Sequence, residues 1–242
     1  MLVVELDGKP TLAKLVGSDI PCLALTPPAA LAEYLETHGL GRVAKRLATS
    51  GVIEVVATAA PGIDDIVVLG KIKQLEQSGT YDLIVVDGPA AGHAITFLMA
   101  PTNLLKLVRS GPIHSQAIEV AQLLTDPDRS QVILVTLPET TPVNEVIETA
   151  GALHDDGGLR LGPVVVNAFD QGADLLADRA AANSPLRAAA EFRNARRALH
   201  RRESERLGKA LELDQIQLPL LATQSLDRDA IAELVKCLED RP

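Results

Sequence analysis

The chain has 242 residues, of which 47% are hydrophobic and only 2% aromatic, and its formal net charge at pH 7 is −9. A chain of this length can bury a sizeable core without disulfide or metal staples. The acidic balance excludes a general binder of the phosphate backbone, and the scarcity of aromatic rings argues against a stacking surface for single-stranded nucleic acid. We therefore expect no nucleic-acid partner.

The two cysteines, Cys22 and Cys237, lie far apart in the sequence. They form neither a CxxC pair nor a disulfide framework, which favours a reducing compartment. No apolar run approaches the ~18–20 residues of a membrane span, and the first residues lack the basic and apolar regions of a signal peptide. These features predict a cytoplasmic protein.

Strand-like and helix-like segments alternate along the chain. Unbroken apolar runs predict buried strands at residues 2–6, 83–87, 131–137, 161–167 and 216–221. Apolar residues at helical spacing predict helices at residues 11–16, 29–48 (two short ones), 64–77, 94–108, 113–124, 138–153, 173–213 (broken near 184–185) and 227–238. Residues 19–30 are predicted to be loop, and residues 52–57 fit a strand or a helix.

This alternation predicts an α/β fold in which helices flank a parallel sheet in three layers. Because neither an internal repeat nor a low-complexity tail is present, we expect one domain over residues 1–242.

The most informative stretch is residues 83–93, a β-branched run that ends in Asp87 and continues into a loop with two glycines. A parallel sheet delivers such a residue to its carboxyl edge, where α/β proteins bind ligands. The carboxylate of Asp87 then either holds Mg²⁺ beside nucleotide phosphates or caps the next helix. The strand at residues 2–6 is followed by Asp7 and Gly8 in the same way.

Four motifs stand in a fixed order: residues 4–10 (VELDGKP), 60–65 (APGIDD), 86–93 (VDGPAAGH) and 135–145 (VTLPETTPVNE). In this order they resemble the ArsA-like ATPases, which comprise arsenical-pump ATPases, tail-anchored-protein-targeting ATPases and their bacterial, actinobacterial-type relatives. The resemblance covers essentially the whole chain. It implies a P-loop NTPase fold of the deviant Walker A class and a cytoplasmic ATPase. In such an enzyme Mg-ATP switches a dimer between states that hold or release an anion or membrane-protein client.

The resemblance also implies roles for individual residues. Asp7 matches the catalytic aspartate that positions the water attacking the γ-phosphate. Asp87 matches the catalytic aspartate that orders the Mg²⁺ shell. The nucleotide-binding positions are Gly92 and His93 near the γ-phosphate, Asn167 at adenine, and Pro219, Leu220 and Leu221 around the adenine pocket. From the residues alone, Asn167 fits a cap of its own turn equally well, and His93 an ordinary surface residue.

One family feature is missing from these residues. The Gly-rich loop that cradles phosphates, GxxxxGK[ST], occurs nowhere in the sequence, and the Gly70-Lys71 pair falls inside a predicted helix. In the family this loop belongs to a βα unit that precedes the strand at residues 2–6. Two interpretations follow: either the start is placed too late, or the chain is a shortened paralogue. In the second case it is a non-catalytic subunit that binds and completes a partner ATPase, as a homodimer or a heterodimer.

The cysteines also depart from the family: the chain has neither a CxxC pair for zinc nor a three-cysteine cluster for arsenite. Residues 187–209, around Arg197, are rich in arginine. This segment fits a docking helix for an acidic partner, a paralogous subunit or anionic lipid, or a solvated face with i,i+4 ion pairs. A partitioning ATPase of the MinD/ParA kind, a third functional class, would need such a basic patch.

Overall fold

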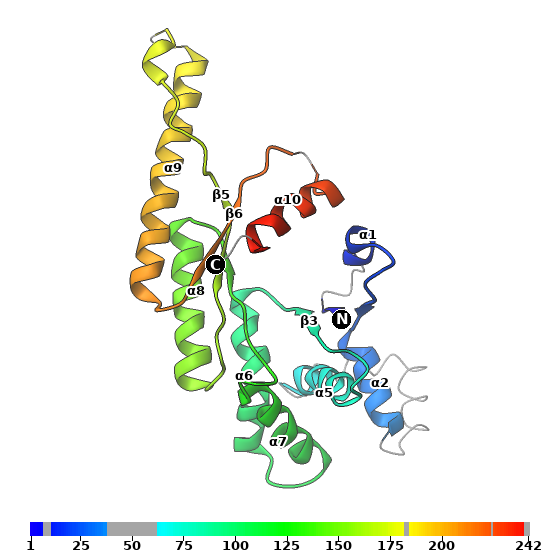
Figure 1. Cartoon of the computed structure of the whole chain (residues 1–242). Coiled ribbons are helices and arrows are strands. Elements are labelled where there is room, and N and C mark those ends of the chain that lie inside the picture. Colours follow the sequence, from blue (N-terminus) through cyan, green and yellow to red (C-terminus); the bar gives the residue numbers. More distant parts are fainter. Residues whose placement is uncertain (7–10, 38–61, 182–183, 224, 240–242) are drawn as a thin grey trace. The chain divides into compact units, whose positions relative to one another are not determined.

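The computed structural model describes residues 1–6, 11–37, 62–181, 184–223 and 225–239 (Figure 1). The chain divides into two compact units. The first comprises Met1–Ser130 with Asp155–Leu159, and the second Gln131–His154 with Arg160–Pro242. Whether they act as the single domain expected from the sequence stays a prediction.

The first unit contains a three-stranded parallel sheet in the order β2-β1-β3. In chain order its elements are β1 (Leu2–Glu5), α1 (Leu12–Val16), β2 (Cys22–Ala24), α2 (Pro27–Thr37), α5 (Ile63–Gln77), β3 (Ile84–Asp87), α6 (Ala91–Leu107) and α7 (Pro112–Thr125). Aliphatic side chains of β1, α2, α5, α6 and α7 form its core. All four residues of β1 are buried, as expected for a strand inside a parallel sheet.

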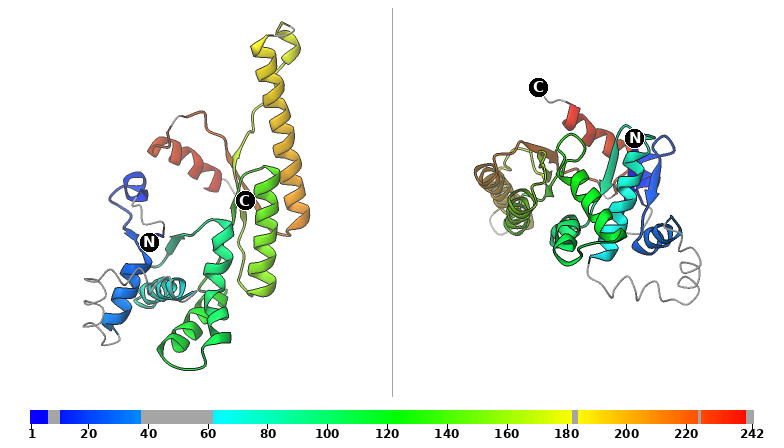
Figure 2. Two further views of the ribbon diagram at one scale, coloured as in Figure 1. Left: turned by 180° about the vertical axis from the view of Figure 1, so that it is seen from behind. Right: turned by 90° about the horizontal axis from the view of Figure 1, so that it is seen from below.

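The second unit contains another three-stranded parallel sheet, in the order β4-β5-β6. Its strands are β4 (Val135–Thr136), β5 (Val164–Phe169) and β6 (Gln215–Pro219), and its helices are α8 (Thr140–Gly151), the 3₁₀ turn η2 (Ala177–Arg179), α9 (Pro185–Ala210) and α10 (Arg228–Glu239). The π-helical segment η1 (Ala152–Asp156) follows α8. The helices α8 and α9 pack side by side, as two views show (Figure 2).

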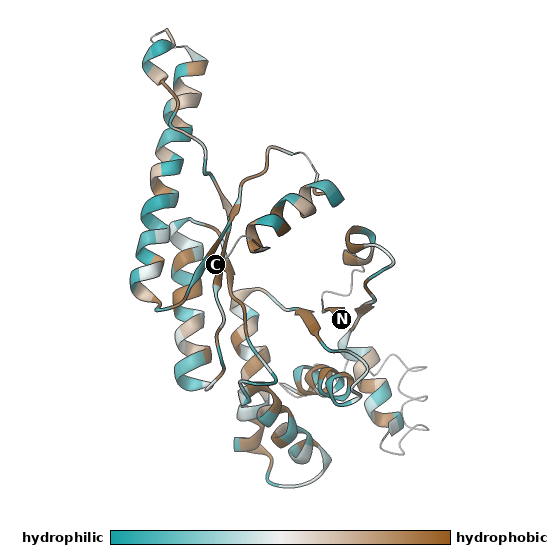
Figure 3. Cartoon of the chain, viewed as in Figure 1, coloured by the Kyte–Doolittle hydropathy of each residue, from teal (hydrophilic) through white to brown (hydrophobic). Residues whose placement is uncertain are grey.

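The helix α9 is long and hydrophilic along most of its length (Figure 3). It begins where the sequence provides a start signal. Ser184 accepts a hydrogen bond from the backbone N–H of Arg187 at 3.2 Å, and Pro185 occupies the first turn, where its missing N–H does no harm. Among the described helices, none combines the length and apolar content that crossing a membrane requires.

The α/β class, with parallel strands flanked by helices, is confirmed. Two local predictions are wrong. Residues 19–30 are not all loop, because three of them form β2 and Pro27 opens α2 from a position that tolerates proline. In the predicted helix over residues 173–213 the expected break near 184–185 is confirmed, because Ser184 is the N-cap of α9, but the part before it is wrong, since the described residues there form loop and the 3₁₀ turn η2. Residues 38–61, with the expected second short helix and the ambiguous segment 52–57, lie outside the described residues.

Candidate functional site

Two acidic residues lie side by side at the carboxyl edge of the first sheet. Parallel pairing places Glu5 of β1 in register with Asp87 of β3, so that the two side chains share one face of the sheet. Glu5 is buried, with 1% of its surface exposed, whereas Asp87 is exposed. The carboxyl edge is where α/β sheets bind ligands, and the sheet therefore brings two carboxylates to that edge.

The carboxylate of Glu5 organises the chain that follows β1. Its Oε1 accepts hydrogen bonds from the backbone N–H groups of Thr11 and Leu12, both at 2.9 Å, and from the Thr11 hydroxyl at 3.2 Å. These contacts satisfy backbone donors at the start of α1. Its Oε2 is buried and has no hydrogen-bond partner among the described residues. The predicted catalytic Asp7 lies outside the described residues, between these two anchors in the sequence.

The start of α6 follows Asp87 after a short loop. Ala90 cannot cap this helix with its side chain, so its first N–H groups are offered to other acceptors. The N–H of His93 donates to the Ala90 carbonyl at 2.9 Å, whereas the N–H of Gly92 has no partner in the described part of the chain. Of the two predicted phosphate sensors, Gly92 is therefore the better placed to offer a backbone donor.

The side chain of His93 faces α5. Its Nε2 lies 3.6 Å from Oδ1 of Asp65, and its ring lies 6.4 Å from that of Phe97. Burial raises the pKa of Asp65, and the nearby His93 partly offsets this by lowering it. Burial and the neighbouring Asp65 also raise the pKa of Asp64. The motif at residues 60–65 thus supplies a half-buried acidic group to the start of α6, a contact that sequence reasoning missed.

In the second unit, the predicted adenine-binding residues lie at the ends of two paired strands. Phe169 of β5 is in register with Pro219 of β6, and the Leu220 N–H donates to the Phe169 carbonyl at 3.0 Å. Asn167 caps its own turn, because its Oδ1 accepts the Ala168 N–H at 2.9 Å while Ala168 adopts a left-handed φ of 56°. This hydrogen bond therefore supports the interpretation of Asn167 as a cap of its own turn.

The loop after β5 is held against α9 by buried polar groups. The side chain of His200, 1% exposed, has two donors at its ring nitrogens: the Asp170 backbone N lies 3.3 Å from Nδ1, and the Arg196 Nε lies 3.3 Å from Nε2. A neutral imidazole has a single acceptor nitrogen, so one of these donors faces a ring N–H. Arg193 binds the Asp170 carboxylate through two hydrogen bonds, of 2.9 and 3.1 Å, which lower the pKa of Asp170.

The stability of this loop should depend on pH through His200. Burial lowers the pKa of His200, and the adjacent Arg196 guanidinium lowers it further. The negative charges of Glu139 and Asp170 act in the opposite direction. Neutral His200 therefore contributes its full stabilisation at pH values above about 6.5, the pKa of a histidine in the unfolded chain. That stability is lost as the pH falls from there toward the lower folded pKa, because the unfolded chain then binds more protons.

We expect wild-type protein to lose more unfolding free energy between pH 7.5 and 5.5 than His200→Gln does, which urea titrations at both pH values would measure. Asp170 and Glu203 have lowered pKa values, and their shared contributions cancel in this difference. Equal losses in the two proteins would contradict the assignment to His200.

The basic segment around Arg197 is largely neutralised by carboxylates. Its ion pairs are Arg187 with Asp178 and Glu191, Arg193 with Asp170, Arg196 with Glu139, Arg197 with Asp170 and Asp174, Arg201 with Asp174, and Arg202 and Arg206 with Glu203. Most partners come from other elements rather than from i,i+4 positions. The arginines therefore fasten α9 to the described loops and to α8, and among the described pairs only that of Arg187 with Glu191 has the i,i+4 spacing expected for a solvated face.

The structure thus brings together some predicted site residues within each unit. Asp87, Gly92 and His93 lie in the first unit, and Asn167, Pro219, Leu220 and Leu221 in the second. That they form one nucleotide site stays a prediction. Among the described residues, no group of three or more His, Cys, Asp or Glu is arranged to hold a metal ion alone.

Comparison with known proteins agrees with these motifs. The sequence model of the anion-transporting ATPase (ArsA ATPase) family matches residues 32–118, from α2 into α7, including Asp87, Gly92 and His93. ATPase BagA of Mycobacterium tuberculosis is 31% identical over 191 residues, which cover 69% of this chain and 56% of BagA. In sequence, the chain is thus similar to the ArsA-like ATPases.

More distant ArsA-like proteins match shorter parts. A Halobacterium salinarum protein described as a candidate arsenical pump-driving ATPase is 28% identical over 116 residues, 45% of this chain and 18% of its own length. ATPase GET3B of Arabidopsis thaliana is 22% identical over 159 residues, 51% of this chain and 39% of GET3B. The chain spans just over half the length of the mycobacterial relative. Asp7, Asn167 and residues 219–221 fall outside the segment that the family model matches.

Proposed function

We propose that this chain binds Mg-ATP as part of an ArsA-family ATPase, and that the nucleotide switches a dimer between conformations that hold or release an anion or protein client. The observation that carries this proposal is the edge at which Asp87 lies beside Glu5 and leads directly into the uncapped start of α6. Asp87 and the start of α6 lie within the segment matched by the family model, whereas Glu5 lies outside it. It offers carboxylates for a cation and N–H groups for phosphate oxygens.

The residues at this edge fit Mg²⁺. Asp87 would hold the ion directly or through water, and Oε2 of Glu5, which has no hydrogen-bond partner among the described residues, is a buried acceptor at the paired position of the neighbouring strand. When bound, Mg²⁺ neutralises charge on the β- and γ-phosphates. The Gly92 N–H would donate to a phosphate oxygen, and Asp7 would accept a hydrogen bond from the attacking water and fix its line of attack. Asn167 and residues 219–221 would contact adenine.

A second candidate is a non-catalytic subunit that completes a partner ATPase. No GxxxxGK[ST] loop occurs in the 242 residues, so a phosphate cradle would have to come from other residues. In addition, Leu83 and Val85, on and beside β3, are exposed large apolar side chains. Apolar surface at a sheet edge suits coverage by another polypeptide. The partner in this case is a paralogous ATPase that carries the cradle.

Titration of a fluorescent ATP analogue, with and without Mg²⁺, tests the proposal. We expect Asp87→Asn to weaken Mg-dependent nucleotide binding by about 10- to 100-fold, since loss of a group that orders a metal shell has effects of this size. The matched control is Asp82→Asn, which removes the same charge from an exposed residue just before β3 and should leave the affinity unchanged.

The two candidates predict different outcomes of this titration. Mg-dependent, Asp87-dependent binding by this chain alone supports the first. Binding that appears only after a paralogous ATPase is added, and still depends on Asp87, supports the second. Equal affinities for wild type and Asp87→Asn in every mixture would contradict both.

A further inference from the structure

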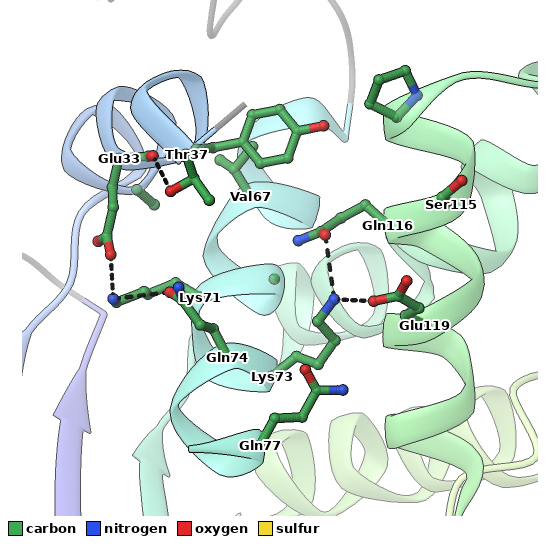
Figure 4. Close-up of a pocket in the computed structure, with 14 residues that line it drawn as sticks. Glu33, Thr37, Val67, Lys71, Lys73, Gln74, Gln77, Ser115, Gln116 and Glu119 are labelled. Carbon is green, nitrogen blue, oxygen red and sulfur yellow. Dashed lines mark hydrogen bonds and ion pairs between the residues drawn. The ribbon is translucent and has the colours of Figure 1, made fainter. Parts of the chain in front are cut away.

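A polar pocket of about 460 Å³ lies among α2, α5 and α7 in the first unit (Figure 4). Its volume falls within the usual range of small-molecule sites. Its lining from α5 runs from Val67 to Gln77, whereas the Asp65 that faces His93 lies nearer the start of that helix. The pocket is therefore built from side chains other than those assigned to the nucleotide.

The floor of the pocket explains a glycine in the middle of a helix. Gly70 is buried inside α5, where glycine is less favourable than alanine. A Cβ atom added to Gly70 would stand 1.5 Å from Nε2 of Gln116 on α7. The missing side chain thus leaves room for the Gln116 amide, whose Oε1 accepts a hydrogen bond of 3.4 Å from Nζ of Lys73.

Two lysines flank this floor, and both are more buried than the carboxylates that pair with them. The side chain of Lys73 is 9% exposed, whereas that of its partner Glu119 is 52% exposed. Lys71 is 20% exposed, and its partner Glu33 is 45% exposed. Lys71 also donates to Oε1 of Gln74 at 3.1 Å. The ammonium groups thus belong to the pocket wall, and the carboxylates belong to its solvent-facing rim.

This asymmetry has a chemical consequence. A half-exposed glutamate can turn into water at little cost, whereas the buried Lys73 ammonium needs an anionic or polar partner. An incoming anion that replaces Glu119 would keep Lys73 paired and would gain charge-assisted hydrogen bonds. The amides of Gln74, Gln77 and Gln116 and the hydroxyl of Ser115 line the same space for uncharged oxygens.

We propose that this pocket binds a small molecule bearing an anionic oxygen group, a phosphate or a carboxylate, held by Lys73. Glu119 is the internal competitor that occupies Lys73 when no ligand is present, whereas Lys71, on the opposite side of α5, stays paired with Glu33 of α2. The proposal is independent of the nucleotide site, because no residue of the pocket is assigned to ATP or Mg²⁺.

Calorimetric titration of the full chain with inorganic phosphate, pyrophosphate and citrate, in a buffer free of other multivalent anions, tests this site. We expect saturable binding either of the two phosphate probes or of citrate. Binding of phosphate or pyrophosphate indicates a phosphate ligand, and binding of citrate indicates a carboxylate ligand. Lys73→Met should weaken it at least about tenfold, because a hydrogen bond to a charged group is lost. Glu119→Gln should tighten it about two- to fivefold, because an exposed ion pair no longer competes.

The matched control is Lys106→Met, which removes the same charge from an exposed residue of α6 and should leave binding unchanged. Methionine fills much of the volume of Lys73, and replacing a buried ion by an apolar residue is often tolerated. Glu119→Gln, at the rim, keeps the test open if Lys73→Met does not fold. The proposal is overturned if no probe binds more tightly than about 10 mM. It is also overturned if Lys106→Met weakens binding as much as Lys73→Met, or if Glu119→Gln leaves the affinity unchanged.

Discussion

Replacing Asp7 by asparagine is expected to lower the turnover number for ATP hydrolysis by about 100-fold or more, while the affinity for Mg-ATP stays nearly the same. A carboxylate that orients or activates the attacking water contributes about 10²–10⁴-fold to the rate. Its effect is exerted on the reacting water rather than on ground-state binding of the nucleotide. An asparagine keeps the size of the side chain but loses its charge and basicity.

The path of β1 gives a further reason to expect that Asp7 orients the attacking water at the carboxyl edge of the first sheet. β1 ends at Glu5, in register with Asp87, so the chain leaves the sheet at the edge proposed for Mg²⁺ only two residues before Asp7. Single-turnover hydrolysis and nucleotide titration, in the ATP-hydrolysing assembly that contains this chain, separate chemistry from binding. Asp19→Asn, an equal charge change at an exposed loop residue, is the control. Hydrolysis at the wild-type rate by an Asp7→Asn assembly that still binds Mg-ATP would show that another group performs this role.

Much of the fold could be predicted because its strands are unbroken apolar runs. β1, β3 and β5 follow directly from aliphatic segments at residues 2–6, 83–87 and 161–167, and α5 follows from a helical repeat. β2 could not be found in this way: it has three residues and lies between prolines. β4 is also reduced to Val135–Thr136, with an isolated bridge between Val132 and Leu161. Short strands gain their pairing from tertiary contacts rather than from a local pattern.

In the candidate site, too, local sequence signals reveal some residues, whereas the contacts between elements become visible only in the structure. Asp87 could be singled out because it ends an apolar strand, a purely local signal. The signal for Glu5 was equally local, a charged residue inside a buried strand, yet its role became visible only through hydrogen bonds to Thr11 and Leu12. The contacts of Asp65 with His93 and of Lys73 with Glu119 join different helices. No spacing rule within one element predicts such pairs.

Replacing Arg197 by alanine should lower the unfolding free energy of the second unit by about 3 kcal/mol, the lower end of the range for breaking a buried ion pair. The Arg197 and Asp170 side chains are 9% and 11% exposed, with Nε and Oδ1 3.6 Å apart, and Arg197 also pairs with Asp174. The loss falls at the low end because Arg193 still binds Asp170 and because the buried Nε of Arg197 has no hydrogen-bond acceptor among the described groups.

Arg201→Ala is the matched comparison, since it removes the same side chain one turn further along α9. Its pair with Asp174 spans 3.9 Å between half-exposed side chains, and such pairs contribute about 0–1 kcal/mol. Urea unfolding of both variants measures the difference. Similar losses would mean that burial does not decide the strength of these pairs. A large loss confined to Arg197→Ala would mean that the basic helix serves chiefly to clamp Asp170, and with it the turn of Asn167 at the carboxyl end of β5. A change in α9 would then reach the predicted adenine contact through that clamp.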